Sequence, residues 1–157
     1  MRQFNRDSAN AARVRQDQLT KPPGSLGMLE TLAAFMAGWR GRVDPRIDMA
    51  QALIFAGNHG VCARGINPFP VEVTAQMVQK FEQGGAAINQ LCRVAGAQLA
   101  VIALELDRPT RDFTAGPAMT VAEVRDAMQS GAEAVDGAAD VLVLGEDIIV
   151  EIVRPGT

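Results

Sequence analysis

The stretch AQALIFA at residues 50–56, followed directly by GNHG at 57–60, decides the fold. A short and nearly unbroken apolar run of this kind predicts a strand that is buried on both faces, as strands of parallel sheets are. Two further runs have the same character, QLAVIALEL at 98–106 and DVLVL at 140–144. Strands of this type that alternate with helical patterns predict an α/β fold, with a parallel sheet and right-handed crossovers.

Helical spacing of apolar residues fills the intervals between these runs. Residues 71–81 form one predicted helix, and residues 88–95, closed by Gly96, form a second. Thr120 and Glu123 form a capping box that opens a third. The apolar face predicted for this third helix consists of Val121, Val124, Met128, Ala132 and Val135.

The N-terminal part has a different character. Residues 1–24 are polar and end in KPPG, which predicts an extended or turning segment. Ser25 then caps a predicted amphipathic helix over 26–40. We therefore divide the chain into an N-terminal helical segment, residues 1–45, and an α/β core, residues 46–157. The tail after 146, DIIVEIVRPGT, predicts one more strand or a dimer contact.

Composition and charge exclude several classes of protein. Of the 157 residues 48% are hydrophobic and 21% are charged, as in ordinary globular proteins. The net charge of −3 argues against a nucleic-acid-binding protein, which needs a basic stripe to meet phosphates. No apolar run approaches the roughly 18 residues of a membrane helix. We therefore expect a cytoplasmic protein that keeps Cys62 and Cys92 as reduced thiols.

Polar and glycine residues follow each predicted strand. They lie at 58–60, at 105–112 and at 145–146. In open parallel sheets the ligand binds beyond the carboxyl ends of the strands. The architecture alone therefore predicts one crevice that these three segments line, without specifying its ligand.

Several stretches between residues 19 and 146 carry a more specific pattern. They are KPPGSLG with LE at 21–30, NHGV at 58–61, EVTAQM at 72–77, GGAAIN at 84–89, RDFT with GPAMT at 111–120, and GE at 145–146. In this order and at this spacing they resemble the nicotinate-nucleotide–dimethylbenzimidazole phosphoribosyltransferase family. That resemblance implies a Rossmann-like α/β domain, a smaller helical piece built from both chain ends, and a homodimer.

The resemblance also implies a reaction and its small-molecule substrates. Enzymes of this family transfer 5-phosphoribose from nicotinate mononucleotide to 5,6-dimethylbenzimidazole, which gives α-ribazole 5′-phosphate for the lower ligand of cobalamin. The incoming base loses its N–H proton, so a carboxylate near that nitrogen is the natural proton acceptor. The flat apolar base calls for an apolar slot. We expect no cofactor and no metal.

On this resemblance Glu146 is the candidate catalytic residue, and it would reach the base or the ribose. Three side chains, Phe69, Pro70 and Met77, would line the apolar slot. The remaining candidate substrate-binding residues are Asn58, His59, Arg111 and Asp112.

This sequence also departs from the family pattern. The C-terminal half, which carries the family's catalytic glutamate, has no counterpart here. DIIVE at 147–151 replaces the glycine-rich loop that would hold the phosphate, and Asn58 replaces an aspartate. We therefore expect this chain alone to be inactive. Two alternatives are a shortened, non-catalytic paralogue that binds a benzimidazole or α-ribazole, and a module whose partner chain supplies the missing half. A further hypothesis is a longer natural protein.

Plainer structural interpretations stand beside these site assignments. His59, the only histidine, fits a hydrogen-bonded structural role better than a zinc site, which needs four ligands. Phe69 and Met77 fit the core on spacing alone. Lys21 fits a solvated charge. Arg111 and Asp112 fit either a surface ion pair or residues that order the crevice loop.

Overall fold

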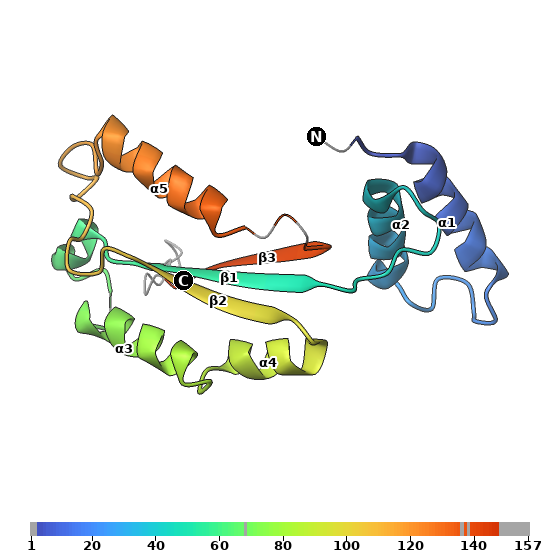
Figure 1. Ribbon diagram of the computed structural model, residues 1–157, viewed down its shortest axis with the longest axis horizontal. Coiled ribbons are helices and arrows are strands. Elements are labelled where there is room, and N and C mark those ends of the chain that lie inside the picture. The colour runs from blue at the N-terminus through green and yellow to red at the C-terminus, as the bar shows by residue number, and fades with distance from the viewer. Residues whose placement is uncertain (1–2, 68, 136, 138, 148–157) are drawn as a thin grey trace, which may run out of the picture. The chain divides into compact units, whose positions relative to one another are not determined.

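The computed structural model describes residues 3–67, 69–135, 137 and 139–147. The chain divides into two compact units, Met1–Ile47 and Asp48–Thr157. The first unit contains helices α1 and α2, and the second contains the strands and the other helices (Figure 1). The predicted tail strand after 146 falls on residues 148–157, which lie outside the described residues.

The first unit is a pair of packed helices, α1 (Arg6–Gln18) and α2 (Met28–Arg40). Asn5 caps the start of α1, because its side-chain oxygen accepts the Ser8 backbone N–H at 2.9 Å. It has no counterpart among the helices predicted from apolar spacing, because it buries only the small side chains of Ala9 and Ala12. A polar helix that packs through alanines leaves no apolar stripe in the sequence.

The start of α2 corrects one prediction. Ser25 does not cap the helix, since the N-cap is Gly27 and no side chain there makes a capping hydrogen bond. Gly27 has a φ of 53°, in the left-handed region where a glycine is favoured. The turn before α2 is held instead by the Glu30 carboxylate, which accepts from the Leu26 backbone N–H at 3.2 Å.

Lys21 is not a solvated charge. Its Nζ lies 2.7 Å from Glu30 Oε1, and its side chain is only 13% exposed. This hydrogen bond to Lys21, followed by the one from the Leu26 backbone, lowers the pKa of Glu30 below its ordinary value. The KPPGSLG stretch therefore folds back onto the first turn of α2 around one carboxylate.

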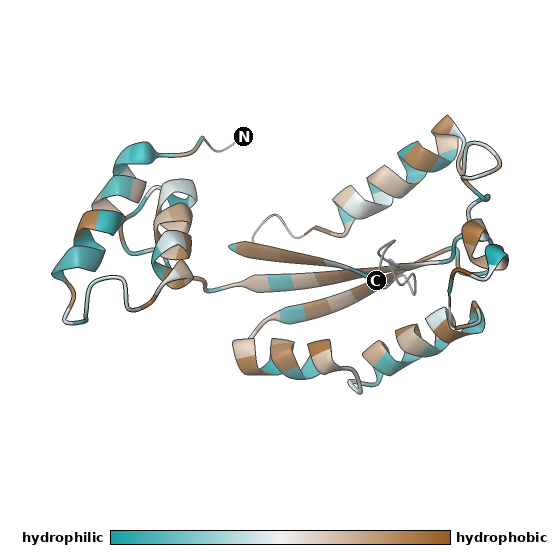
Figure 2. Ribbon diagram, turned by 180° about the vertical axis from the view of Figure 1, so that it is seen from behind, coloured by the Kyte–Doolittle hydropathy of each residue, from teal (hydrophilic) through white to brown (hydrophobic). Residues whose placement is uncertain are grey.

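The second unit is built on a parallel sheet, as predicted. Its strands are β1 (Ala50–Gly57), β2 (Gln98–Leu104) and β3 (Val141–Asp147), in the order β2-β1-β3. Strand β1 pairs in parallel with both neighbours. The carboxyl ends of all three strands therefore lie together at the same end of the sheet, on the left in Figure 1. The strands are mostly hydrophobic along their length (Figure 2).

Helices lie on both faces of this sheet. After β1 come the short 3-10 helix η1 (Gly60–Arg64), α3 (Glu72–Glu82) and α4 (Ala87–Ala95), and the last two cover one face. Helix α5 (Val121–Glu133) lies on the other face (Figure 1). Thr120 and Glu123 form the predicted capping box at its start.

Strand alternation assigns side chains to these two faces. Leu53, which is fully buried, shares its face with Leu144 of β3. On the same face, Gln51 Nε2 donates to the carbonyl oxygen of Ala134 at the end of α5, at 3.2 Å. Leu53 and Leu144 therefore point to the α5 side, and Ala52 and Ile54 point to the side of α3 and α4.

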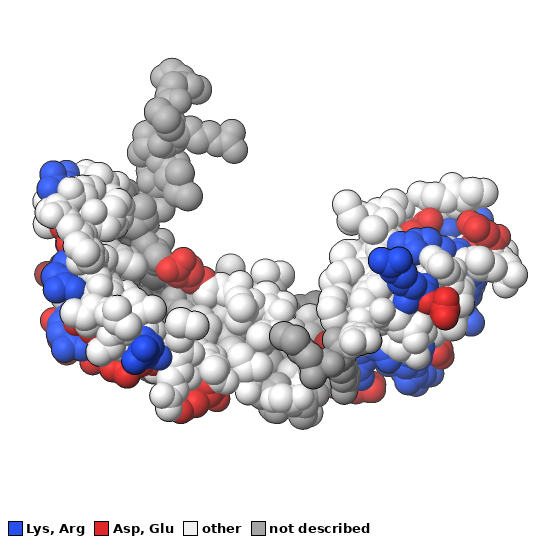
Figure 3. Space-filling view, turned by 90° about the horizontal axis from the view of Figure 1, so that it is seen from above, with Lys and Arg blue, Asp and Glu red and all other residues white. Residues whose placement is uncertain are grey.

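The structure is relevant to two of the protein classes that the sequence argued against, membrane-spanning and nucleic-acid-binding proteins. No helix in the part of the chain that the structure describes is long and apolar enough to cross a membrane. On the face shown in Figure 3, basic and acidic side chains are interspersed rather than gathered into one basic stripe. This face has no pattern typical of nucleic-acid binding.

The loops that follow β1 and β2 are bonded to each other. Thr110 N donates to Asn58 O at 3.0 Å, and Gly60 N donates to Thr110 O at 2.7 Å. The Asn58 side-chain amide donates to Leu106 O at 2.8 Å. His59 Nδ1 lies 3.3 Å from Thr110 Oγ1. We call this set, residues 58–60 with Leu106 and Thr110, the loop clamp.

A glycine is required at position 60 because the backbone of the loop after β2 lies very close to it in the loop clamp. A Cβ at this position would lie 2.4 Å from Thr110 O, 2.8 Å from Asp112 N and 2.9 Å from the Arg111 carbonyl carbon. All three atoms belong to the backbone, so a side chain could not be accommodated without moving the second loop.

Replacement of Glu30 by Gln will destabilise the first unit at neutral pH. A glutamine cannot form the charged hydrogen bond with Lys21, so the midpoint of the unfolding transition falls. Trp39, the only tryptophan, lies in α2 and reports this transition by its fluorescence. Because the folded pKa of Glu30 is lowered, the stabilisation is present above its unfolded pKa and is lost as the pH falls through the folded one.

The matched control is Asp17→Asn, which removes an exposed carboxylate from α1. It should leave the midpoint nearly unchanged. An equal loss in both variants, or a Glu30→Gln effect that persists in acid, would contradict the role of this ion pair.

Replacement of Gly60 by Ala will strain the loop clamp. Overpacking of this kind costs about 1–3 kcal/mol in the free energy of unfolding, which far-UV circular dichroism in denaturant measures. Gly116→Ala is the control, because that glycine lies in the loop after β2 with nothing within 4 Å of its Cβ position. Equal free energies of unfolding for the two variants would show that the two loops leave room for a side chain at position 60.

Candidate functional site

The strand order fixes where a ligand is expected. The chain passes from β1 to β2 on one side and then crosses β1 to reach β3 on the other. In doubly wound sheets with this start, the crevice opens at the carboxyl ends of the first and third strands, where the order reverses. Asn58 follows β1 there, and Glu146 lies near the end of β3.

Glu146 stands at this switch point in an open position. The sheet register places it opposite Phe55, and alternation points it to the α5 side. It is exposed, and among the described residues it makes no hydrogen bond and no ion pair. Gly145 before it is closely packed, since a Cβ there would lie 2.6 Å from Ile54 Cδ1. The carboxylate is therefore free to accept a proton or a hydrogen bond from a ligand.

The three residues predicted to form the apolar slot lie on the other side of the strand ends. Phe69 and Pro70 are exposed and precede α3, and Met77 is half-buried on that helix. Helix α3 covers the face opposite to α5 (Figure 1). A ligand that touches both Met77 and Glu146 must therefore lie across the ends of the strands.

Asn58 and His59 belong to the loop clamp. The side-chain amide of Asn58 is engaged by Leu106 O, and the His59 ring is half-buried against Thr110. This contact with Thr110 fits the hydrogen-bonded structural role that the sequence suggested for His59. Both residues border the switch point, so a role in substrate binding stays a prediction.

Arg111 and Asp112 do not form an ion pair with each other. Asp112 pairs with Arg64 of η1, and its other oxygen accepts from the Thr114 hydroxyl at 2.7 Å and the Thr114 N–H at 2.9 Å. The Thr114 hydroxyl, followed by Arg64, lowers the pKa of Asp112. Arg111 pairs with Glu123 of α5, at 3.6 Å. Each residue therefore orders the loop after β2 through a different partner.

A cavity of about 360 Å³ lies between this loop and α5. Its volume falls within the range of small-molecule sites. Arg111 is the only predicted site residue that lines it. The lining consists of Leu104, Glu105, Arg108, Pro109, Thr110, Arg111, Ala118, Met119, Glu123, Asp126, Ala127 and Ser130.

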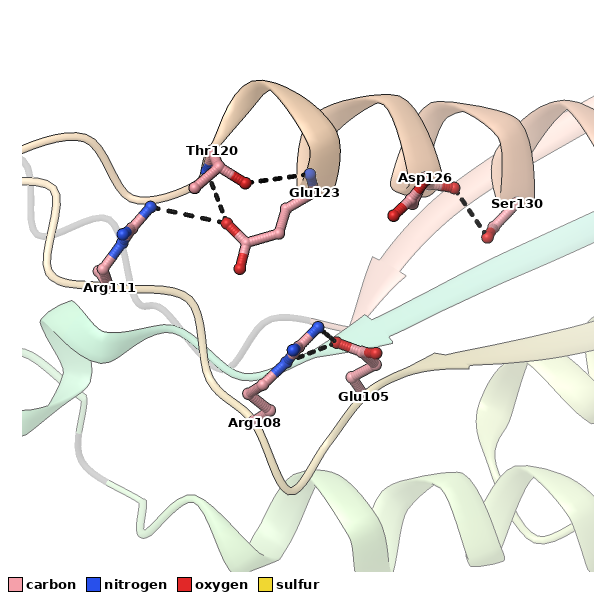
Figure 4. A network of polar contacts seen from close by, with 7 residues as sticks. All are labelled: Glu105, Arg108, Arg111, Thr120, Glu123, Asp126 and Ser130. Carbon is pink, nitrogen blue, oxygen red and sulfur yellow. Dashed lines mark hydrogen bonds and ion pairs between the residues drawn. The ribbon is translucent and has the colours of Figure 1, made fainter.

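The charges in this cavity are largely paired (Figure 4). Arg108 forms a short ion pair with Glu105, and Arg111 pairs with Glu123. The Thr120 backbone N–H, followed by its hydroxyl, lowers the pKa of Glu123, so this carboxylate stays ionised. Asp126, on the next turn of α5, has a carboxylate without a hydrogen bond or ion pair among the described residues. The cavity therefore favours a small ligand that offers a hydrogen-bond donor, and not an anion.

Glu105 has an unusual backbone. Its φ of 43° is the only positive value among the non-glycine residues that the structure describes. A residue in this region is strained by about 1–3 kcal/mol, and such strain gathers at functional sites. One partial signal for this cavity was present in the sequence, the capping box that holds Glu123. The fold that brings Arg108 and Glu105 to face α5 was not predictable from residue spacing.

The described residues include no group of three His, Cys, Asp or Glu side chains that could hold a metal ion. Both cysteines are free thiols, with Cys92 buried and Cys62 half-buried.

Comparison with known proteins places this geometry in a family. A family model described as phosphoribosyltransferase matches residues 1–149. The nicotinate-nucleotide–dimethylbenzimidazole phosphoribosyltransferase of Rhodobacter capsulatus is 65% identical over 136 residues, which are 87% of this chain and 41% of that protein. The protein of the same name from Ruegeria pomeroyi is 63% identical, over 86% of this chain and 40% of that one.

Two solved structures from Thermus thermophilus share the fold. The CobT crystal structure has a TM-score of 0.77 and 35% identity, and the match covers 89% of this chain and 48% of that one. The structure of nicotinate-nucleotide–dimethylbenzimidazole phosphoribosyltransferase has a TM-score of 0.80 and 36% identity, and the match covers 91% of this chain and 49% of that one. The chain thus spans about two fifths of the curated relatives and about half of the solved chains.

The resemblance that the motifs carry is therefore confirmed over nearly the whole sequence. Because the family model matches residues 1–149 and the relatives agree with it in name and fold, this chain belongs to the nicotinate-nucleotide–dimethylbenzimidazole phosphoribosyltransferase family.

Proposed function

We propose that this chain takes part in the transfer of phosphoribose from nicotinate mononucleotide to 5,6-dimethylbenzimidazole. The observation that carries the proposal is the family match over residues 1–149, together with the position of its motif residues at the carboxyl ends of β1 and β2. The chain spans 41% of the length of the first of these relatives.

The reaction needs little acid catalysis. A ring nitrogen of the incoming base attacks the C1′ atom of the ribose, and nicotinate leaves with the electron pair of the broken C–N bond. Its pyridinium ring becomes neutral, so no proton has to be supplied to it. The attacking base becomes cationic and then loses its N–H proton, for which a carboxylate is a suitable acceptor.

The described residues support binding of the base across the strand ends. Glu146 offers an exposed carboxylate there, and Phe69, Pro70 and Met77 offer apolar surface from the α3 side. Burial of an aromatic base removes about 150–250 Å² from water, which contributes roughly 4–6 kcal/mol before the cost of association. The loop clamp joins the loops after β1 and β2 beside these residues.

One observation favours a second candidate function. Asn58 stands where the family pattern has an aspartate, and its side-chain amide donates to Leu106 O, so this position offers no carboxylate for catalysis. In that case the chain is a module that binds a benzimidazole or α-ribazole, and no phosphoribose is transferred.

Incubation with both substrates and calorimetry with the base alone separate these functions. Residues 1–157 alone should bind 5,6-dimethylbenzimidazole and form no α-ribazole 5′-phosphate, because Asn58 replaces the aspartate of the family pattern. Product from residues 1–157 alone would favour the first function over the second. If the base does not bind, even when the rest of the family's chain is supplied, the proposed function is wrong.

Two variants locate the binding. Glu146→Gln keeps the size of the side chain but removes its charge, so the affinity for the base should fall about tenfold. Glu82→Gln makes the same change at an exposed position at the end of α3 and should have no effect. If both variants bind like the unchanged chain, the ligand does not lie at the end of β3.

A further inference from the structure

We propose that Arg64 is a positioning residue for the base-binding site. Through its ion pair with Asp112 it holds η1, and with η1 the apolar residues Phe69 and Pro70, against the loop after β2. This inference rests on the proposed function, in which Phe69 and Pro70 offer apolar surface to the base. It goes further, because it names a residue outside the stretches that resemble the family and gives Asp112 a partner within the protein instead of the substrate.

Asp112 contacts η1 at both of its ends. At the start of the helix, a Cβ on Gly60 would lie 2.8 Å from Asp112 N, so the two backbones are in close contact. At the last residue of the helix, Arg64 Nε donates to Asp112 Oδ2. The loop clamp bonds η1 at its start, through Gly60. The ion pair adds a second tie at the other end, so η1 cannot turn about the clamp.

The carboxylate of Asp112 is oriented before Arg64 reaches it. Its Oδ1 accepts both the hydroxyl and the backbone N–H of Thr114, which leaves Oδ2 for Arg64. The Thr114 hydroxyl, followed by Arg64, lowers the pKa of Asp112, so this group is ionised at neutral pH. The side chain of Asp112 is 23% exposed, against 56% for Arg64. The pair therefore joins η1 to an acceptor that is already fixed, which reduces the side-chain entropy lost when it forms.

Phe69 and Pro70 lie between two anchored points of the chain. Directly after Arg64 the chain turns at Gly65, whose φ is 73°. After Pro70 begins α3, which packs against β1 and β2. Within the segment, Phe69 N donates to Asn67 Oδ1 at 3.1 Å. Two fixed ends restrict the apolar residues between them, which lowers the cost of ordering them when the base binds. Loss of the ion pair releases one of these ends.

The ion pair should affect binding of the base more than stability of the fold. An exposed pair of this kind contributes little to the free energy of folding. The upper end of the range measured for such pairs corresponds to about a fivefold change in an equilibrium constant. We therefore expect removal of the pair to weaken base binding by about fivefold and to leave the unfolding midpoint nearly unchanged.

Calorimetric titration of residues 1–157 with 5,6-dimethylbenzimidazole tests the inference. Arg64→Gln removes the charge and should weaken binding by about fivefold. Arg64→Lys keeps a charge within reach of Asp112 and should restore most of the affinity. At about 1 M salt the difference between the unchanged chain and Arg64→Gln should shrink, because salt screens an exposed ion pair. A residue that only stabilised the fold would show neither the rescue by lysine nor this dependence on salt.

Arg42→Gln is the matched control. It removes another exposed Arg–Asp ion pair, which Arg42 forms with Asp44 in the first unit. The affinity for the base should stay that of the unchanged chain. An equal loss of affinity in Arg42→Gln and Arg64→Gln overturns the proposal. So does an Arg64→Gln variant that binds the base as tightly as the unchanged chain.

Amide hydrogen exchange, followed by NMR, tests the anchor without a ligand. The N–H groups of Gly65 and Phe69 are both hydrogen-bonded, and both should exchange faster in Arg64→Gln than in the unchanged chain. The Gly60 N–H belongs to the loop clamp and should keep its rate, which also shows that the variant is folded. Unchanged exchange at Phe69 overturns the proposal.

The two measurements separate this inference from the proposed function. Faster exchange at Phe69 in Arg64→Gln, in a chain that does not bind the base, supports the anchoring role of Arg64 and contradicts the proposed function. Base binding that Arg64→Gln leaves unchanged supports the proposed function and contradicts this inference.

Discussion

The structure of the second unit depends on β1 being enclosed by parallel neighbours. Leu53 in its middle is fully buried, and each residue from Gln51 to Ala56 is paired on both sides. Parallel strands of apolar residues are normally covered on both faces. In this chain β1 is also paired at both edges, whereas β2 and β3 each pair with β1 alone in the described sheet. The switch point at the carboxyl ends of the strands follows from this strand order.

The family motifs serve this scaffold as much as the chemistry. KPPGSLG with Glu30 folds a turn onto the start of α2, and Gly60 with Thr110 joins the loops after β1 and β2. Asp112 then ties the second of these loops to η1. The motifs therefore fix the distances between strand ends. Among the described site residues, Glu146, Phe69, Pro70 and Arg111 are exposed, and of these four Arg111 pairs with Glu123.

Much of the fold was predictable, because buried parallel strands are continuous apolar runs. The strands at 50–56, 98–106 and 140–144 and the capping box at Thr120 needed only local patterns. Helix α1 was missed, since its buried residues are alanines within a polar stretch. The cap at Ser25 was wrong because α2 begins later, after Gly27, and the Glu30 carboxylate holds the preceding turn through the Leu26 N–H. Side-chain contacts between distant segments leave no periodic signal in a sequence.

The site was predictable to a smaller extent. The carboxyl ends of the strands follow from the α/β alternation, and Glu146 lies near the end of β3, inside the strand rather than after it. The cavity beside α5 was not foreseen, because a helix is expected to turn its apolar stripe inward and α5 turns its polar side.

Amide hydrogen exchange across the three strands tests this account most directly. In the chain alone, the amides of β1 should exchange slowest, while those at 142–144 exchange much faster because the outer edge of β3 is open. If β3 is as protected as β1, the open edge is not where this account places it.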